Sequence, residues 1–386
     1  MWKHIAANGI SMLIVALIAA AGALGWGQAQ WNGQGPLQTA AFFEVEQGDT
    51  LGEVSERLED AGAIGSAMVF RIGTRALDRS GDLRFGNYEI PAGASMEEVL
   101  DIVTAGGPSA FRYTATYVLR NSGIGQLRLS ERVPGTGEVE EIARFAYEEG
   151  VPEAYSALVE AGTPMIYRLV IPEGLTSWQI VEGMRAADFL DGEVADLPAE
   201  GSLAPATIEV NRGEDRNDLL AEMMAAQEQI LADAWENRED GLPIDTPEEA
   251  LILASIIEKE TSVPDERGRV ASVFVNRLNQ GMRLQTDPTV IYGVTNGRGI
   301  LGRGLRRSEL DTETPWNTYV ITGLPPTPIA NPGRAAIEAA LNPDETDFIF
   351  FVADGTGGHA FAVTLEEHNR NVARWREIEA ERNADN

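Results

Sequence analysis

Cysteine is missing from this sequence and histidine is scarce, since its 386 residues include only His4, His359 and His368. Without cysteine, the chain can form no disulfide bond, thiolate metal site or cysteine nucleophile. So few histidines also disfavour a histidine-based zinc site and leave few candidates for a Ser-His-Asp triad. We therefore expect neither a metal nor a cofactor.

Positive charge is also scarce. The chain has 30 Lys and Arg against 60 Asp and Glu, and its net charge of −30 repels phosphate backbones and anionic lipid surfaces. We therefore expect no nucleic-acid partner. Lysine itself occurs only at Lys3 and Lys259. Lys259 stands between Glu258 and Glu260, and its simplest role is an exposed ion pair with one of them.

The segment from Thr246 to Thr261, TPEEALILASIIEKET, predicts a helix with a clear beginning. Thr246 can cap the helix, Pro247 suits its first position, and Glu249 completes a capping box. Between residues 250 and 257 only one residue is polar, which predicts a helix that is buried on all sides.

The end of this helix carries the candidate catalytic residue. At helical spacing, Glu260 follows Ile256 and Ile257 on one apolar face. Glu258 lies roughly 200° away around the axis, so the two acids cannot share one site. A carboxyl held against isoleucines has its charged form disfavoured, which raises its pKa toward the range that a general acid needs. The alternative is that Glu260 is an ordinary helix-end carboxylate that reaches water or Lys259.

The N-terminus predicts a membrane anchor. The stretch from Ile5 to Trp26 is 22 residues without a charge, enough to span about 30 Å of hydrocarbon. Trp2 and Trp26 suit the two membrane interfaces, and Lys3 favours a cytoplasmic N-terminus. A cleaved signal peptide is the alternative, although its apolar region is usually about 7–15 residues long. In either case we expect an exported body on a flexible tether from Gly27 to Gln38.

A small strand–turn–helix unit occurs three times in the exported part. The copies are FEVEQGDTLGEVSERL from Phe43 to Leu58, YEIPAGASMEEVL from Tyr88 to Leu100, and YRLVIPEGLTSWQIV from Tyr167 to Val181. Each places a Gly turn and a polar cap before an apolar-periodic helix. Modules this small must pack on each other or on a larger domain, so we expect one or two β-α layers between the membrane and the site.

Other segments predict further elements by their periodicity and turn residues. We expect an extra helical pair within residues 120–165, and a rigid polar turn where Gln285, Thr286 and Asp287 precede Pro288. The expected elements are helices at Val139–Glu149, Val151–Gly162, Asn217–Asn237 (beside the Thr246 helix) and Asp265–Gln280, a short strand at Asn317–Ile321, and a hairpin of Phe348–Ala353 with the run from His359.

Five blocks of the C-terminal half carry a resemblance: ASIIEKET (Ala254–Thr261), VASVFVNRL (Val270–Leu278), GMRLQTDPTVIYG (Gly281–Gly293), NTYVITGLPP (Asn317–Pro326) and FVADGTGGHAF (Phe351–Phe361). Together they closely resemble the YceG-like endolytic murein transglycosylases, the MltG family. The modules from Phe42 onward are similar to the LysM-like subdomain of that family.

The resemblance implies cleavage of nascent peptidoglycan between N-acetylmuramic acid and N-acetylglucosamine, which gives a 1,6-anhydro end. It implies a single-acid mechanism in which Glu260, followed by the hydroxyl residue Thr261, is catalytic. It also implies a single-pass helix in the cell inner membrane, a periplasmic body, and peptidoglycan synthases (penicillin-binding proteins) as partners besides the glycan strands. The candidate substrate-binding residues are Glu258, Lys259, Thr261, Gln285, Asp287, Asn317 and Tyr319.

Two other functions remain open. Pro205-Ala206-Thr207 stands where the family often has an acidic residue. This difference is compatible with a catalytically silent anchored module that binds wall glycan or synthases. Lys259 is the candidate Schiff-base lysine of a pyridoxal-phosphate lyase, against which export and the apolar setting argue.

We expect an α+β fold in which a buried helix of a C-terminal mixed α/β catalytic domain carries the catalytic glutamate. The expected parts are a transmembrane anchor with a short cytoplasmic start (1–28), a linker (29–40), a LysM-like module (41–106), a second strand–turn–helix module with a helical insertion (107–200) and the YceG-like catalytic domain (201–386).

Overall fold

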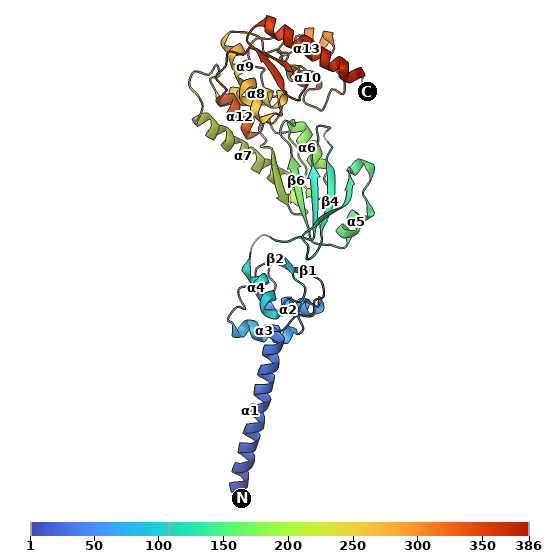
Figure 1. Ribbon diagram of the computed structural model, residues 1–386, viewed down its shortest axis with the longest axis vertical. Coiled ribbons are helices and arrows are strands. Elements are labelled where there is room, and N and C mark those ends of the chain that lie inside the picture. Colours follow the sequence, from blue (N-terminus) through green and yellow to red (C-terminus); the bar gives the residue numbers. More distant parts are fainter. Residues whose placement is uncertain (1, 107–108, 123, 385–386) are drawn as a thin grey trace. The chain divides into compact units, whose positions relative to one another are not determined.

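The structure, a computed structural model, describes residues 2–106, 109–122 and 124–384, and within these ranges the side chains of residues 10–382. It divides into two compact units (Figure 1). Unit 1 comprises Met1–Ala115, Leu129–Ala143 and Pro152–Ile166, and unit 2 comprises Thr116–Arg128, Arg144–Val151 and Tyr167–Asn386.

The chain begins with a long apolar helix, α1 (Trp2–Asn32). Its segment Ile10–Asn32 has 23 residues, contains an 18-residue window with a mean hydropathy of 2.1, and is long and apolar enough to cross a membrane. The flexible tether expected at residues 27–38 is a wrong prediction for residues 27–32, because the helix continues to Asn32. Packing explains this: the ring of Trp31 lies 5.9 Å from that of Phe70. Gly73 leaves room for the indole, since a Cβ there would lie 2.2 Å from it.

Unit 1 contains a small module of two strands and three helices. Its elements are β1 (Ala41–Val45), α2 (Leu51–Asp60), α3 (Ala67–Ala76), β2 (Gly86–Ile90) and α4 (Met96–Ala105). The two strands pair antiparallel, with Ala41 opposite Ile90. The helices close over them with fully buried side chains that include Val54, Leu58 and Val99.

The strand–turn–helix unit is confirmed in all three expected copies: β1–α2, β2–α4 and β6 (Met165–Ile171)–α6 (Ser177–Ala186). The three helices begin with capping boxes at Thr50, Ser95 and Thr176. The structure adds a fourth copy, β8 (Ala206–Val210) followed by α7 (Arg216–Glu236), which Asp215 caps. This copy was not recognised in the sequence, because Asn211-Arg212 precedes its glycine where two of the other copies have a Pro-x pair.

The glycine of each turn is required by its backbone, and Gly174 shows this at φ +77°. We expect Gly174→Ala to lower the free energy of unfolding by about 1 kcal/mol, because L side chains rarely adopt this conformation. The melting temperature should fall by about 2–4 °C. Gly304→Ala is the control, because a Cβ there meets no atom within 4 Å and its φ is not positive. Equal melting temperatures for the two variants would show that the backbone at residue 174 does not require glycine.

A five-stranded sheet has the order β5-β4-β3-β6-β8 and includes β3 (Tyr113–Val118), β4 (Gln126–Arg132) and β5 (Val139–Phe145). The helix expected at Val139–Glu149 is therefore wrong, because this segment is a strand followed by a 3₁₀ turn, Tyr147–Glu149. The N–H of Val133 donates to the carbonyl of Glu138 (2.8 Å). This turn folds β5 back along β4. The second helix of the expected pair is confirmed as α5 (Glu153–Glu160).

Four helices form the core of unit 2: α7, α8 (Pro247–Glu260), α9 (Arg267–Asn279) and α12 (Arg334–Leu341) (Figure 1). The expected burial of α8 is confirmed, and its one polar residue in that run, Ser255, is satisfied by the carbonyl of Ile252 (2.7 Å). Thr246 caps α8 as expected. The capping box is not completed, because the Glu249 carboxylate accepts from the N–H of Asp245 (2.6 Å) instead.

The remaining elements complete unit 2: β7 (Leu190–Asp191), β9 (Glu214–Asp215), a 3₁₀ turn (Pro264–Glu266), α10 (Asp287–Thr295), α11 (Arg307–Asp311), β10 (Phe350–Ala353), β11 (His359–Ala362) and α13 (Leu365–Ala384). The expected hairpin is confirmed as the antiparallel pair β10–β11. The expected strand at Asn317–Ile321 is wrong, because the carbonyl of Asn317 accepts from the N–H of Val320 (2.9 Å), which closes a turn. α13, for which no element was expected, packs on the hairpin.

Candidate active site

Glu260 is the last residue of α8, and the chain leaves the helix at Thr261 with extended backbone. One turn earlier, Ile256 and Ile257 are fully buried in the helical core. The core therefore fixes the helix, while the Glu260 side chain is only half-buried and reaches the surface of unit 2.

Polar groups surround the Glu260 carboxyl. The Thr286 hydroxyl donates to Oε1 of Glu260. Burial raises the pKa of Glu260, and the charge of Asp287 raises it further, whereas the Thr286 hydrogen bond and the charges of His359 and Arg277 lower it. Because burial is the largest effect, the pKa lies above the ordinary glutamate value, and the neutral form persists to higher pH than in an exposed glutamate.

Two cavities meet at Glu260. The larger, of about 610 Å³, lies between the turn that precedes α10, strand β10 and helix α13. The smaller, of about 280 Å³, lies between residues 261–262, the glycine-rich turn of the β10–β11 hairpin and α13. Since Glu260 lines both, a chain-like ligand that crosses both cavities passes this carboxyl.

The structure brings four of the expected substrate-binding residues to these cavities. Gln285, Asp287 and Tyr319 line the larger cavity, and Thr261 lines the smaller. The Tyr319 hydroxyl donates to Oδ1 of Asp287 (2.7 Å). Burial raises the pKa of Tyr319, so its hydroxyl remains a hydrogen-bond donor at neutral pH.

The other three candidates, Glu258, Lys259 and Asn317, lie outside both cavity walls as the described residues form them. The Glu258 carboxylate accepts from the N–H of Gly333 (3.0 Å), and the Lys259 ammonium donates to the carbonyl of Gly174 (3.1 Å). Asn317 is fully buried, and its amide donates to the carbonyls of Glu309, Leu310 and Thr312. In this geometry the three side chains hold loops in place.

A hydrogen-bonded acid–histidine pair beside Glu260, of a buried Glu266 and a half-buried His359, was not predicted from the sequence. Glu266 accepts from the backbone N–H of His359 (2.9 Å), and its other carboxylate oxygen lies 2.9 Å from the ring nitrogen Nδ1 of His359. Gly358 leaves room for this carboxylate, because a Cβ at residue 358 would lie 2.5 Å from it. The pair fixes the His359 ring in the wall of the smaller cavity. In the sequence, Glu266 is an unremarkable acid at a helix start.

Helix α13 was also missed, although it lines both cavities. His368 and Val372 line the larger cavity, and Trp375 and Arg382 line the smaller. The available signal was their helical spacing, which places them along one face. The charged residues between them are instead typical of a solvated surface helix.

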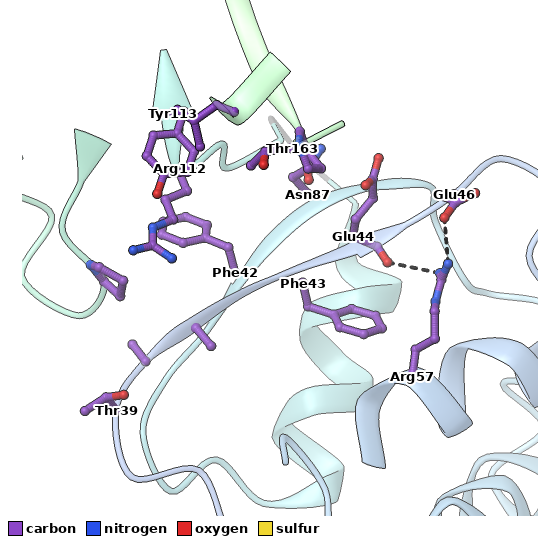
Figure 2. Close-up of a pocket in the computed structure, with 15 residues that line it drawn as sticks. Thr39, Phe42, Phe43, Glu44, Glu46, Arg57, Asn87, Arg112, Tyr113 and Thr163 are labelled. Atoms are coloured by element: carbon purple, nitrogen blue, oxygen red, sulfur yellow. Dashed lines mark hydrogen bonds and ion pairs between the residues drawn. The ribbon is translucent and has the colours of Figure 1, made fainter. Parts of the chain in front are cut away.

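Unit 1 contains a further pocket, of about 810 Å³ (Figure 2). Phe42 and Tyr113 contribute aromatic side chains to it, and the Arg112 guanidinium lies 5.2 Å from the ring centre of Tyr113. Arg57 is paired with Glu46 (2.7 Å). Paired charges and aromatic faces suit ligand contacts better than proton transfer.

The model of the YceG-like family matches residues 144–374, more than half of the chain. The chain belongs to the YceG-like family. The YceG-like match contains Glu260 and the walls of the larger cavity. It ends one residue before Trp375, so part of the smaller cavity lies beyond it.

Two relatives of this YceG-like chain carry the name endolytic murein transglycosylase. The Bacillus subtilis protein is 37% identical over 178 residues, which cover 46% of this chain and 48% of that protein. A Streptococcus pneumoniae protein is 28% identical over 399 residues, which cover 96% of this chain and 65% of that protein. The chain thus spans less than two thirds of each relative. A solved YceG-like protein from Listeria monocytogenes is 25% identical, with a TM-score of 0.45 over 86% of this chain and 98% of that chain.

Proposed function

We propose that this chain is a membrane-anchored endolytic lytic transglycosylase of nascent peptidoglycan. It would cleave the bond between N-acetylmuramic acid and N-acetylglucosamine, leave 1,6-anhydro ends and so terminate strand elongation. The observation that carries the proposal is a half-buried carboxyl with a raised pKa, Glu260, at the junction of two cavities. Family membership and the names of the two relatives support the substrate class.

In the first step, neutral Glu260 is the general acid. With the Thr286 hydroxyl as the donor to Oε1, the neutral carboxyl carries its acidic proton on Oε2. Transfer of that proton to the glycosidic oxygen allows the bond between this oxygen and C1 of N-acetylmuramic acid to break. The sugar acquires oxocarbenium character, which the new carboxylate stabilises.

In the second step, the Glu260 carboxylate accepts the proton of the sugar's own 6-hydroxyl while O6 bonds to C1. The proton returns to Glu260 and no water is consumed. Two-carboxylate glycosidases divide these roles between two acids at a fixed separation. Asp287 also lines the larger cavity, but its carboxylate accepts from Tyr319 and its charge favours neutral Glu260.

The open geometry of the site supports internal cleavage of a strand. A glycan can occupy the larger cavity on one side of Glu260 and the smaller cavity on the other. Sugar hydroxyls need hydrogen-bond partners, and Gln285, Asp287 and Tyr319 supply them along the larger cavity.

Membrane anchoring agrees with helix α1, whose apolar segment is long enough to cross a bilayer. In the proposal, the helix crosses the cell inner membrane, the body lies in the periplasm, and peptidoglycan synthases are its neighbours. The strand–helix–helix–strand order of β1, α2, α3 and β2 supports a LysM-like module at residues 41–106.

Mass spectrometry of the products released from un-cross-linked glycan tests the proposed function. Lytic cleavage gives anhydro-ended fragments, which are lighter by one water molecule than hydrolytic fragments. Hydrolytic ends would indicate that water attacks with the help of a second acid such as Asp287. Glycan binding without fragment release would favour the catalytically silent module.

The hydroxyl of Thr286 should tune the pH dependence of this reaction. A hydrogen bond to Glu260 favours its carboxylate, so Thr286→Val should raise the pKa of Glu260 further. Activity requires the neutral acid and is lost as pH rises through this pKa, so the alkaline limb of the pH–rate profile should move to higher pH. The maximal rate should fall about tenfold, because one positioning hydrogen bond is lost.

Thr286→Ser is the matched control for this prediction, because it keeps the hydroxyl and removes only a methyl group. Its alkaline limb should coincide with that of the unmodified protein. An unmoved limb in Thr286→Val, measured on the same glycan, would mean that the limb reports a group other than Glu260.

A further inference from the structure

We propose that the C-terminal part of α13 forms a sugar subsite, in which Trp375 stacks against one amino-sugar ring held in the smaller cavity. The nature of the ligand rests on the proposed function, which this inference deepens. Trp375 and Arg382 lie beyond residue 374, where the family match ends. Both residues belong to the C-terminal part of α13.

The size and walls of the smaller cavity suit one ring. Its volume of about 280 Å³ lies just below the range of about 300–1,000 Å³ that is usual for small-molecule sites. The walls combine the half-buried indole of Trp375 with the polar residues Thr261, Ser262 and His359. An aromatic face beside convergent polar groups matches a sugar ring, which has apolar C–H faces and hydroxyl edges.

The glycine-rich turn of the hairpin gives the cavity its space. Gly355, Gly357 and Gly358 all line it, so three wall positions in this turn contribute no side chain. The Glu266 carboxylate, behind Gly358, holds the ring of His359 on the same wall. A ring in this cavity therefore lies between Trp375 and the backbone of the turn, next to the Glu260 carboxyl.

Helix α13 holds Trp375 rigidly. At its N-terminal end, the ring of His368 stacks on that of Phe350 with centroids 5.0 Å apart. Further along, Ile378 packs so closely on Gly355 that a Cβ on this glycine would lie 2.9 Å from it. The Arg382 guanidinium donates to the carbonyl of Gly355. Arg382 is thus a positioning residue that holds the turn against the helix.

The same helix supplies a matched control. Arg376 directly follows Trp375 but is exposed, and it lies outside the described walls of both cavities. A change there alters the charge of the helix while it leaves the proposed stacking surface intact.

Calorimetric titration of the full chain with a defined GlcNAc–MurNAc octasaccharide tests the subsite. The background variant is Glu260→Gln, so that the ligand is not consumed. Adding Trp375→Ala should weaken binding by about tenfold, because the stacking face is lost. Trp375→Phe should restore most of the affinity, and Arg376→Ala should leave it unchanged.

Two outcomes overturn the subsite: equal affinities for Trp375→Ala and its background, or a Phe variant that binds as weakly as the Ala variant. Cleavage of the same ligand by the unmodified protein separates the two proposals. If the unmodified protein cleaves the ligand but Trp375→Ala binds it as tightly as the background variant, the subsite proposal is wrong and the proposed reaction stands. If binding depends on Trp375 but the unmodified protein does not cleave the ligand, the proposed reaction is wrong and the subsite stands. A background variant that binds no glycan contradicts both proposals.

Discussion

Glu260→Gln is expected to lower the rate of glycan cleavage by about 10⁴-fold, at the upper end of general acid–base effects. The variant removes the proton donor of the first step and the proton acceptor of the second, because one carboxyl performs both. The amide can still accept the hydrogen bond from Thr286, so the cavities should keep their shape. The measurement is the release of anhydro-ended fragments from un-cross-linked glycan.

Glu258→Gln is the matched control, because it changes an acid two residues away whose carboxylate accepts from Gly333 on another face of α8. Its cleavage rate should stay within about threefold of the unmodified rate, because the amide oxygen can still accept from the N–H of Gly333 and only the charge is removed. A folded Glu260→Gln protein with unmodified activity would remove this residue from the mechanism. Equal losses in both variants would point to a structural effect at the end of α8.

Arg277→Met is expected to lower the free energy of unfolding by about 2–5 kcal/mol. Arg277 is only 7% exposed, and its guanidinium donates to the carbonyls of Leu284 and Ile349. Methionine leaves both carbonyls without this donor. The same bonds join the turn before α10 to the start of β10, two walls of the larger cavity, so activity should fall about 10²-fold through misplacement.

Denaturant unfolding and the cleavage assay measure the two effects of Arg277→Met. Arg277→Lys should recover only part of the stability, because an ammonium lacks the planar fork that reaches both carbonyls. Arg370→Met should change the stability little, because Arg370 is exposed and its ion pair with Glu366 (2.7 Å) lies along the surface of α13. Unmodified stability of Arg277→Met would show that other groups satisfy the two carbonyls.

The helix face on which Glu260 lies could be predicted, because it depends only on residues that are close in the sequence. Glu260 is the third residue after Ile257, and helical periodicity alone places the two on one face. The capped turns at Thr50, Ser95 and Thr176 were predictable for the same reason, since a cap and its helix lie within four residues. Local patterns thus located both the repeated units and the acid.

The walls of the site could not be predicted in the same way. The Arg277 guanidinium donates to the carbonyls of Leu284 and Ile349, which are 65 residues apart in the sequence. Helical spacing cannot predict contacts between such distant residues. Trp375 meets the cavity only because α13 folds back on the hairpin. The helical periodicity of residues 139–149 predicts a helix, although Gly135 and Gly137 just before it indicate a hairpin turn. Both glycines have positive φ in the structure, and the segment after them is strand β5.

The proposed mechanism requires a Glu260 carboxyl that stays neutral at a pH where exposed glutamates are charged. A pH titration of the carboxyl carbons by NMR, with ¹³C-labelled glutamate, tests it directly, and the signal missing from Glu260→Gln gives the assignment. We predict a titration midpoint above the ordinary glutamate value, because burial outweighs the hydrogen bond from Thr286. A midpoint at or below the ordinary value would contradict the account, since Glu260 would then lack the proton that it is proposed to donate.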